Sequence, residues 1–403
     1  MLLTVAFLDV FHGDCAVTTF SEGGGKACIV VDGGEEPDAA RRLAAYLKHE
    51  GVEVIDLLVA THIDSDHVNG LVHFLKSESA KANSWNKGKE GCIRYYWGPK
   101  PDPNWTAPSR RKAPQSQTMN FVIQSVAQNQ ELNKLVEKHI LDAANIYYPS
   151  LQDMPPLNIF NKVRLELMAP DTQILDSAIQ AKALSVSNLP YKQTLGKIAS
   201  TAGRKRLKLK DLRQILAMNA EEMAKVANRN ANNQSIVFRL TPTESRGWSF
   251  LFSGDAEEES WEMMRQMPQV RESLPARVLK VPHHGSINGI NEAAFRAINP
   301  EYAVISVGQK HGLPDGQTLS LIKRGGKRRL FCTERNNSQD HPGPCRQKRR
   351  CLRKTPSDFR SIRFTIDTDS GQERIDMFLV DTKRGEIEIT GGEIWCPENI
   401  WKA

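Results

Sequence analysis

One ten-residue stretch constrains this chain more than any other. Thr61 to Gly70 read T-H-I-D-S-D-H-V-N-G and follow the apolar run Ile55 to Ala60. The run predicts a short buried β-strand, which places the polar residues in the loop at its C-terminal end, where chemistry is usually carried. Four side chains of that loop can bind metal ions: His62, Asp64, Asp66 and His67. Imidazole nitrogens and carboxylate oxygens suit zinc, manganese or magnesium, so the first two predict one ion site and the last two a second.

Two later segments repeat the pattern of an apolar run that ends in metal-capable side chains. In L-F-S-G-D-A the run delivers Asp255, and in V-L-K-V-P-H-H-G-S it ends at His283 and His284. A carboxylate at Asp255 can bridge two ions. The alternative is that Asp255 caps the helix expected over 257–264, since Asp is a favoured N-cap residue. Adjacent histidines after a strand are seldom packing residues, so the two segments together favour a dinuclear centre.

In this order, the motifs resemble the metallo-β-lactamase superfamily of hydrolases and, within it, the soluble domain of ComEC-type competence DNA-uptake proteins. The wider superfamily reads His-x-His-x-Asp-His, and Asp64 replaces the middle histidine here as in the competence branch. The resemblance covers about residues 1–74, 163–170 and 230–314. Four further segments carry it: F-L-D-V-F-H-G-D-C-A (Phe7 to Ala16), V-V-D-G-G (Val30 to Gly34), N-N-Q-S-I-V-F (Asn232 to Phe238) and A-V-I-S-V-G (Ala303 to Gly308).

The resemblance implies a set of metal ligands: His62 and Asp64 for the first ion, Asp66 and His67 for the second, Asp255 between them, and one of His283 and His284 to complete the second site. Of the adjacent histidines, His283 is slightly preferred. The superfamily's third motif normally supplies a histidine where this chain has Asn232 or Asn233. The first ion is then poorer in imidazole ligands, so manganese or magnesium competes with zinc.

Two divalent cations side by side suit phosphodiester hydrolysis by a shared water. Among the expected catalytic residues, Asp66 orients the water or accepts its proton and His67 supports it as a ligand. Lys280 or His311 is a candidate to contact the scissile group, the alternatives being a solvated lysine and a loop histidine. We therefore expect a DNA or RNA nuclease. The alternatives are a phosphodiesterase of a small cyclic or signalling nucleotide, and a nucleic-acid-binding subunit with a vestigial metal site.

The net charge of +7 supports a polyanionic partner, because Lys and Arg contacts to phosphate dominate nucleic-acid affinity. The alternative for each basic cluster is a solvated face. The expected nucleic-acid-binding residues are Arg204, Lys205, Arg206, Arg328, Arg329, Arg349 and Arg350. Four aromatic side chains either stack on the bases of a single strand or form a satellite core: Tyr95, Tyr96, Trp97 and Trp105. A companion protein in a defence or processing system is a further expectation.

Seven cysteines, an odd number, fit reduced thiols better than a disulfide framework. Cys15 and Cys28 alternate within apolar strands and are expected in the core. The basic segment that contains Cys332, His341, Cys345 and Cys351 forms either a small zinc site or, as the irregular spacing favours, a loose polyanion-binding loop. No stretch is long and apolar enough to span a membrane, and the first residues read as a strand and not a signal peptide, so the cytoplasm is expected.

The expected fold is α/β (α+β), an αββα metallo-β-lactamase-like sandwich with two largely helical insertions and a C-terminal β extension. The hydrolase domain covers residues 1–320, with insertions at about 77–162 and 172–229. A basic Cys/His-containing loop follows over 321–355, and the β extension covers 356–403. Within this plan, helices are predicted over 37–50, 119–144 and 211–227.

Overall fold

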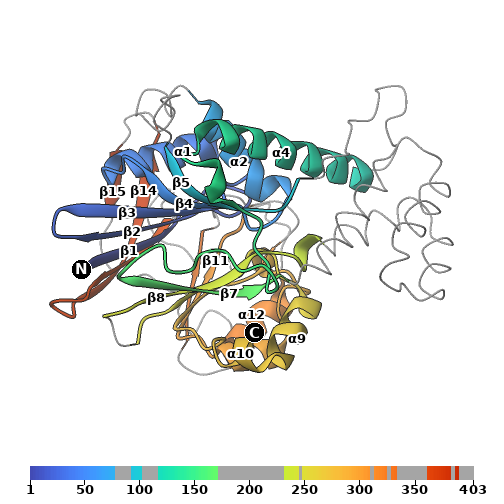
Figure 1. Cartoon of the computed structure of the whole chain (residues 1–403). Coiled ribbons are helices and arrows are strands. Elements are labelled where there is room, and N and C mark those ends of the chain that lie inside the picture. The colour runs from blue at the N-terminus through green and yellow to red at the C-terminus, as the bar shows by residue number, and fades with distance from the viewer. Residues whose placement is uncertain are drawn as a thin grey trace, which may run out of the picture.

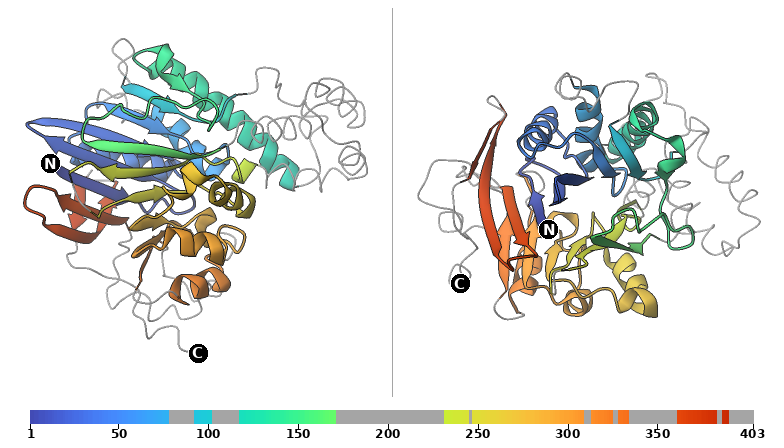
Figure 2. Two further views of the ribbon diagram at one scale, coloured as in Figure 1. Left: turned by 60° about the horizontal axis from the view of Figure 1, so that its bottom comes forward. Right: turned by 60° about the vertical axis from the view of Figure 1, so that its left-hand side comes forward.

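Two β-sheets face each other in the computed structural model, with helices on both outer faces (Figure 1). The structure describes residues 1–77, 92–101, 117–170, 231–244, 247–308, 313–324, 328–333, 361–382 and 386–389. In this part of the chain the layers run helix, sheet, sheet, helix, as the sequence predicts, and Figure 2 shows the same order from two other sides. Among the described residues no helix combines the length and the apolar character needed to cross a bilayer.

The first sheet has nine strands in the described residues, in the order β15-β14-β13-β1-β2-β3-β4-β5-β6. Its strands are β1 (Leu2–Phe7), β2 (Ala16–Glu22), β3 (Gly25–Val31), β4 (Ile55–Val59), β5 (Ile93–Trp97), β6 (Ile146–Tyr147), β13 (Ser361–Asp367), β14 (Glu373–Asp381) and β15 (Glu386–Ile389). The second sheet has six there, in the order β12-β11-β10-β9-β8-β7. They are β7 (Val163–Ala169), β8 (Val237–Pro242), β9 (Phe250–Phe252), β10 (Val278–Lys280), β11 (Tyr302–Ile305) and β12 (Arg329–Cys332).

Helices cover the outer face of each sheet. On the first sheet they are α1 (Pro37–His49), α2 (Ser65–Lys76) and α4 (Gln117–His139), with the short 3₁₀ turn η2 (Ala143–Asn145). On the second they are α9 (Glu258–Gln266), α10 (Pro268–Arg271), α11 (Glu292–Ile298) and α12 (Gly316–Arg324), and the 3₁₀ turn η4 (His283–Gly285) follows β10. The helix predicted over 37–50 is confirmed, and the one over 119–144 is present but ends at His139. The helix predicted over 211–227 lies outside the described residues.

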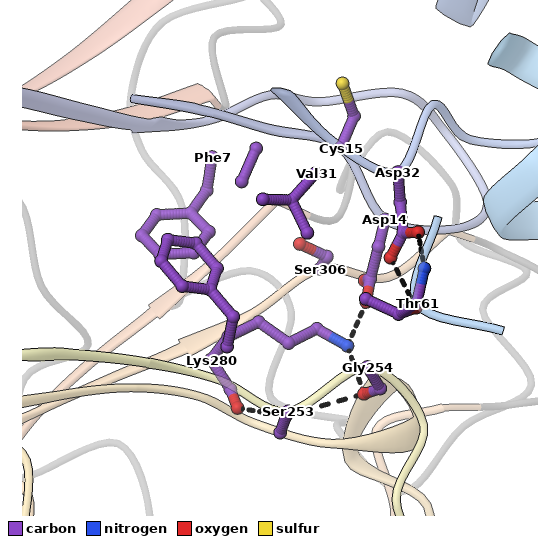
Figure 3. Close-up of a pocket in the computed structure, with 12 residues that line it drawn as sticks. Phe7, Asp14, Cys15, Val31, Asp32, Thr61, Ser253, Gly254, Lys280 and Ser306 are labelled. Atoms are coloured by element: carbon purple, nitrogen blue, oxygen red, sulfur yellow. Dashed lines mark hydrogen bonds and ion pairs between the residues drawn. The ribbon is translucent and has the colours of Figure 1, made fainter. Parts of the chain in front are cut away.

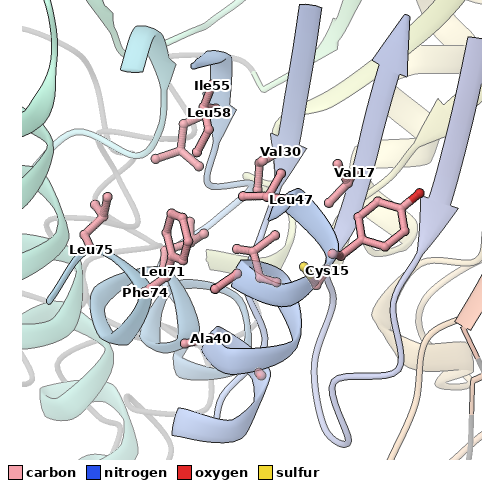
Figure 4. Close-up of a cluster of buried hydrophobic side chains, with 14 of the residues drawn as sticks. Cys15, Val17, Val30, Ala40, Leu47, Ile55, Leu58, Leu71, Phe74 and Leu75 are labelled. Atoms are coloured by element: carbon pink, nitrogen blue, oxygen red, sulfur yellow. The ribbon is translucent and has the colours of Figure 1, made fainter. Parts of the chain in front are cut away.

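Strand β4 shows why a central strand is mostly apolar, with Asp56 as the one charged residue of its five. Ile55 and Leu58 pack under the helices of the first sheet (Figure 4), whereas Leu57 and Val59 point into the layer between the sheets. A strand that is covered on both faces reads as a continuous apolar run, and parallel pairing of β4 with β3 and β5 is typical of such strands. Packing in the two core layers therefore fixes the orientation of β4. This in turn sets the direction of the chain that follows the strand.

Two expectations change in the structure. The segment expected to open a large insertion supplies β5, in which Tyr96 and Trp97 are fully buried, so these two side chains form core and cannot stack on bases. The C-terminal strands were expected as an added antiparallel β element, and they are antiparallel. They are not separate, however, because β13 pairs with β1 and extends the first sheet. Trp105 lies outside the described residues.

The core positions of Cys15 and Cys28 predict unreactive thiols. Burial raises the pKa of both thiols well above the usual range, so neither carries thiolate near neutral pH. At pH 8 we expect iodoacetamide to label them at least roughly 100-fold more slowly in the folded protein than in urea, as mapped by mass spectrometry of tryptic peptides. Equal labelling rates in the two states would contradict the buried placement.

Candidate metal centre

The strand β4 and the start of helix α2 carry the first motif. His62 and Asp64 precede the helix, and Asp66 and His67 lie in its first turn, so the motif is not entirely the loop that the sequence predicts. The reason is that Asp64 takes the extended N-cap conformation, and the helix begins at Ser65. All four metal-capable side chains are buried, with at most 8% of each residue exposed, which is unusual for charged groups without a bound partner.

Four buried side chains from three segments meet at one place: Asp66, His67, Asp255 and His284. They offer ligand atoms that all lie within 4.8 Å of one another. Nε2 of His284 is 2.9 Å from Oδ2 of Asp66 and 3.3 Å from Oδ2 of Asp255. Nε2 of His67 is 3.3 Å from Oδ1 of Asp255. The structure therefore assembles the residues predicted for the second ion, with His284 as the adjacent histidine.

The slight preference for His283 in this second site is accordingly wrong for the geometry. The two histidines have positive φ angles, 48° at His283 and 51° at His284. Their ring planes lie at 72° to each other, with centroids 6.3 Å apart. The left-handed backbone sends His284 toward Asp66 and His283 toward Glu257, a distinction that sequence spacing does not contain.

The residues predicted for the first ion lie beside the same carboxylate, Asp255. Nε2 of His62 is 3.8 Å from Oδ2 of Asp64 and 4.0 Å from Oδ2 of Asp255. Asp255 thus lies between the two sets of residues, in the place that a bridging carboxylate needs. The alternative that Asp255 caps the following helix is wrong, because Glu257 is the N-cap residue of α9.

The imidazoles have the arrangement of metal ligands. In each of three rings Nδ1 faces a fixed oxygen: Oδ2 of Asp32 at 2.8 Å from His67, the carbonyl of Ser306 at 2.9 Å from His284, and Oγ1 of Thr61 at 3.2 Å from His62. Their Nε2 atoms are buried and have no partner in hydrogen-bonding geometry among the described residues. A carbonyl or carboxylate on Nδ1 and an open Nε2 typify metal-bound histidine, so the residues fit divalent ions.

The electrostatics of the cluster agree with this fit. Burial and the neighbouring His67 lower the pKa of His62 to about 4, so this ring is neutral at pH 7, as a metal ligand must be. Burial alone would lower the pKa of His67 and His284, but Asp255 and other carboxylates raise both well above the usual value. Burial would raise the pKa of Asp66, but the adjacent imidazoles hold it well below its usual range. The centre attracts positive charge strongly.

A second layer of charged groups contains Asp14, Asp32 and Lys280 (Figure 3), and the sequence analysis assigned no role to its two aspartates. Asp32 accepts hydrogen bonds from the main-chain N–H and the hydroxyl of Thr61, each at 2.7 Å. Lys280 forms an ion pair with Asp14 and donates to the carbonyl of Gly254 at 2.9 Å. Both aspartates stand beside apolar strands, in F-H-G-D-C and V-V-D-G-G, which is the signal that marked Asp255 and could have identified them.

This layer is better explained as a positioning shell than as a further metal site. Asp14, Asp32 and His67 also form a group with metal-site spacing. The ammonium of Lys280 already supplies a cation there, and Nζ of Lys280 lies 3.6 Å from Oδ1 of Asp255. Lys280 is only 4% exposed and its partners are protein atoms behind the centre, so the structure gives it a different setting from the solvated lysine alternative.

The two asparagines of the third-motif region have different surroundings. Asn233 accepts a hydrogen bond from the N–H of Ser260 and donates to Glu259 at 2.8 Å, which secures the first turn of α9. Asn232 is 2% exposed and donates to Oε1 of Glu257 at 3.1 Å. Of the two asparagines, Asn232 therefore contacts Glu257, whereas Asn233 supports the start of α9.

Of the residues predicted to bind nucleic acid, only Arg328 and Arg329 are described, and the contacts described for them lie elsewhere in the fold. Arg328 donates to the carbonyl of Pro300 and to Asn299. Arg329 starts β12, which pairs in parallel with β11, and Ser306, which contacts His284, follows the opposite end of β11. The remaining candidates lie outside the described residues: Arg204, Lys205, Arg206, His311, His341, Cys345, Arg349, Arg350 and Cys351. Cys332 alone of the proposed zinc segment is described, so that site stays a prediction.

A comparison of this chain with protein families gives a match that agrees with the fold and the centre. The model of the metallo-beta-lactamase superfamily matches residues 12–82, which include the whole first motif. The resemblance read from the sequence is confirmed, and the chain is a metallo-β-lactamase-like α/β sandwich. Together with the buried cluster, this match supports a metal-dependent hydrolase.

The chain is also similar to an individual protein. The chain is 33% identical over 136 residues to ComE operon protein 3 of Bacillus subtilis (strain 168). The match covers 33% of this chain and 16% of that protein. The similarity to the competence branch is thereby confirmed over that stretch, while the rest of the relative has no counterpart in the match.

The Lys280–Asp14 pair yields a stability prediction. Replacing Lys280 with Met leaves the carboxylate of Asp14 buried without its cation, and removing one partner of such a pair costs about 3–5 kcal/mol. We expect urea unfolding of K280M to show that loss. The double variant K280M/D14N should lose clearly less than the two single losses combined. The exposed Lys48→Met variant is the control, and a wild-type midpoint for K280M would contradict the assignment.

Proposed function

We propose that this chain is a metal-dependent phosphodiesterase that cleaves DNA or RNA and uses two divalent cations. The observation that carries the proposal is the position of Asp255. Its Oδ1 lies 3.3 Å from Nε2 of His67, and its Oδ2 lies 3.3 Å from Nε2 of His284 and 4.0 Å from Nε2 of His62. A carboxylate shared by two sets of ligands is what a pair of adjacent cations needs.

The residues have separable tasks in this proposal. When bound, two divalent cations lower the pKa of a shared water and offset the charge on the attacking and leaving oxygens. Asp66 stays ionised at neutral pH, and its Oδ2 lies 3.4 Å from Nε2 of His12, so its carboxylate is set to hold a cation and to orient the water. Asp32 holds the ring of His67, and Ser306 holds that of His284, so both keep Nε2 toward the centre.

Two arguments favour a nucleic acid as the substrate. The net charge of +7 attracts polyanions, and the relative that the chain matches is a competence operon protein. Because Arg328 and the start of β12 are engaged within the fold, the phosphate contacts of this proposal come from the basic clusters 204–210 and 346–354. The donor set mixes carboxylates and imidazoles, so manganese, magnesium and zinc are all to be tested.

Replacement of Asp66 tests the catalytic assignment. D66N keeps the shape of the side chain but removes its charge, so we expect at least a ~10²-fold loss of cleavage rate. The control is Asp153→Asn, at an exposed carboxylate remote from the motifs. The measurement is the initial rate of cleavage of labelled oligonucleotides with saturating Mn²⁺. Unchanged activity in D66N would remove Asp66 from the proposed mechanism.

The substrate class is tested with the wild-type chain on single-stranded DNA, duplex DNA, RNA and cyclic dinucleotides, each with Zn²⁺, Mn²⁺ or Mg²⁺. Polymer cleavage that D66N abolishes supports the proposal. Turnover of cyclic dinucleotides alone would replace it with a small-nucleotide phosphodiesterase. Salt-sensitive binding to polymer without turnover under any metal would indicate a binding subunit.

A further inference from the structure

Asn232, Glu257 and His283 form a linked set of polar residues. The ligands assigned to the second ion give this set no role. Asn232, which stands where the superfamily's third motif normally has a histidine, donates its amide to Oε1 of Glu257 at 3.1 Å. The same Oε1 lies 3.1 Å from Nδ1 of His283. Asn232 and Glu257 are only 2% and 3% exposed. A buried carboxylate beside Nδ1 of a histidine is the setting that orients metal-bound imidazoles.

The backbone directs His283 toward Glu257 and Asp255. Two successive left-handed residues reverse the chain after β10, and Gly285 continues the turn at φ 79°. A Cβ at Gly285 would meet Pro314 at 2.7 Å, so the turn is packed tightly in place. Nε2 of His283 then lies 4.0 Å from Oδ2 of Asp255, which is also 4.0 Å from Nε2 of His62.

One of the residues predicted for the first ion, His62, has a ring nitrogen that is available to bind a metal ion. Nε2 of His62 is buried and has no hydrogen-bond partner among the described residues, although Oδ2 of Asp64 lies 3.8 Å away. Oδ1 of Asn232 is likewise buried without a partner there. Nε2 of His62 and Nε2 of His283 approach the same oxygen of Asp255, and a cation between them would satisfy the open imidazole nitrogen of His62.

We propose that His283 is a ligand of the first ion, held by Glu257, and that it replaces the histidine missing from the third motif. The adjacent histidines then serve one ion each, His283 with His62 and Asp64 on one side of Asp255, and His284 with Asp66 and His67 on the other. This inference rests on the proposed two-ion function, but it makes a separate claim about which side chains bind which ion. Glu257 is a positioning residue because it acts through His283.

The test measures metal binding without activity. Chain stripped with a chelator is titrated with Mn²⁺ alone, and bound Mn²⁺ per chain is determined by equilibrium dialysis with elemental analysis. The wild type should bind two ions and H283A one. Anomalous scattering from Mn²⁺-soaked crystals of H283A should place the remaining ion beside Asp66 and His284. H284A should give the reverse pattern, and His49→Ala, at an exposed helical histidine, should bind two.

A milder variant keeps the test valid if H283A does not fold, which circular dichroism would reveal. Glu257→Gln keeps the size of the side chain but loses its charge, so the weaker of the two Mn²⁺ affinities should fall by about 10–100-fold while the other stays unchanged. The control is Glu272→Gln, at an exposed carboxylate.

Three results would overturn the inference: two ions of wild-type affinity in H283A, loss of the ion beside Asp66 instead of the one beside His62, or wild-type affinities in E257Q. A wild type that binds a single Mn²⁺ would overturn it as well. The proposed function fails on a different measurement, the absence of phosphodiester cleavage by chain that is loaded with metal. A chain can therefore bind its ions as inferred and still prove not to be a nuclease.

Discussion

The stability of this structure depends on the positive charges that compensate the negative charge buried at its centre. Six carboxylates gather at the centre with at most 8% of any residue exposed: Asp14, Asp32, Asp64, Asp66, Asp255 and Glu257. Lys280 is the buried cation placed among them. Six carboxylates against one ammonium leave an excess of five negative charges while the imidazoles are neutral, and two divalent cations would offset four. Unpaired buried charge is costly, so cation binding and the stability of this fold are coupled.

The fold can gather so much charge because the segments that carry it end at one edge of the sandwich. Parallel pairing of β3 with β4 and of β9 with β10 brings the carboxyl ends of these strands together. The loops that follow pack without spare room. A Cβ on Gly13 would lie 1.9 Å from the carbonyl oxygen of Asp66, and one on Gly70 would lie 1.8 Å from that of Gly33. Glycine at these two positions lets the positioning shell contact the metal-capable residues.

The sequence predicts the parts of this arrangement that follow from order and pattern along the chain. Apolar runs that end in His or Asp locate the strands and most metal-capable residues, including Asp66 and Asp255. The side on which each adjacent histidine lies depends on backbone angles at His283 and His284, which residue types do not specify. The burial of Tyr96 was equally hidden, because an aromatic run reads the same in a core strand as in a binding surface.

The histidines of the centre differ in their access to solvent. The side chains of His67 and His284 are 0% and 2% exposed, whereas that of His283 is 25% exposed. The turn that carries His283 holds two non-glycine residues in the left-handed region, at a cost on the order of 1–2 kcal/mol each. Such strain persists only where the surroundings fix it, and here the close contact of Gly285 with Pro314 does so. The turn therefore holds His284 in the sealed part of the centre and leaves His283 where the centre is partly exposed.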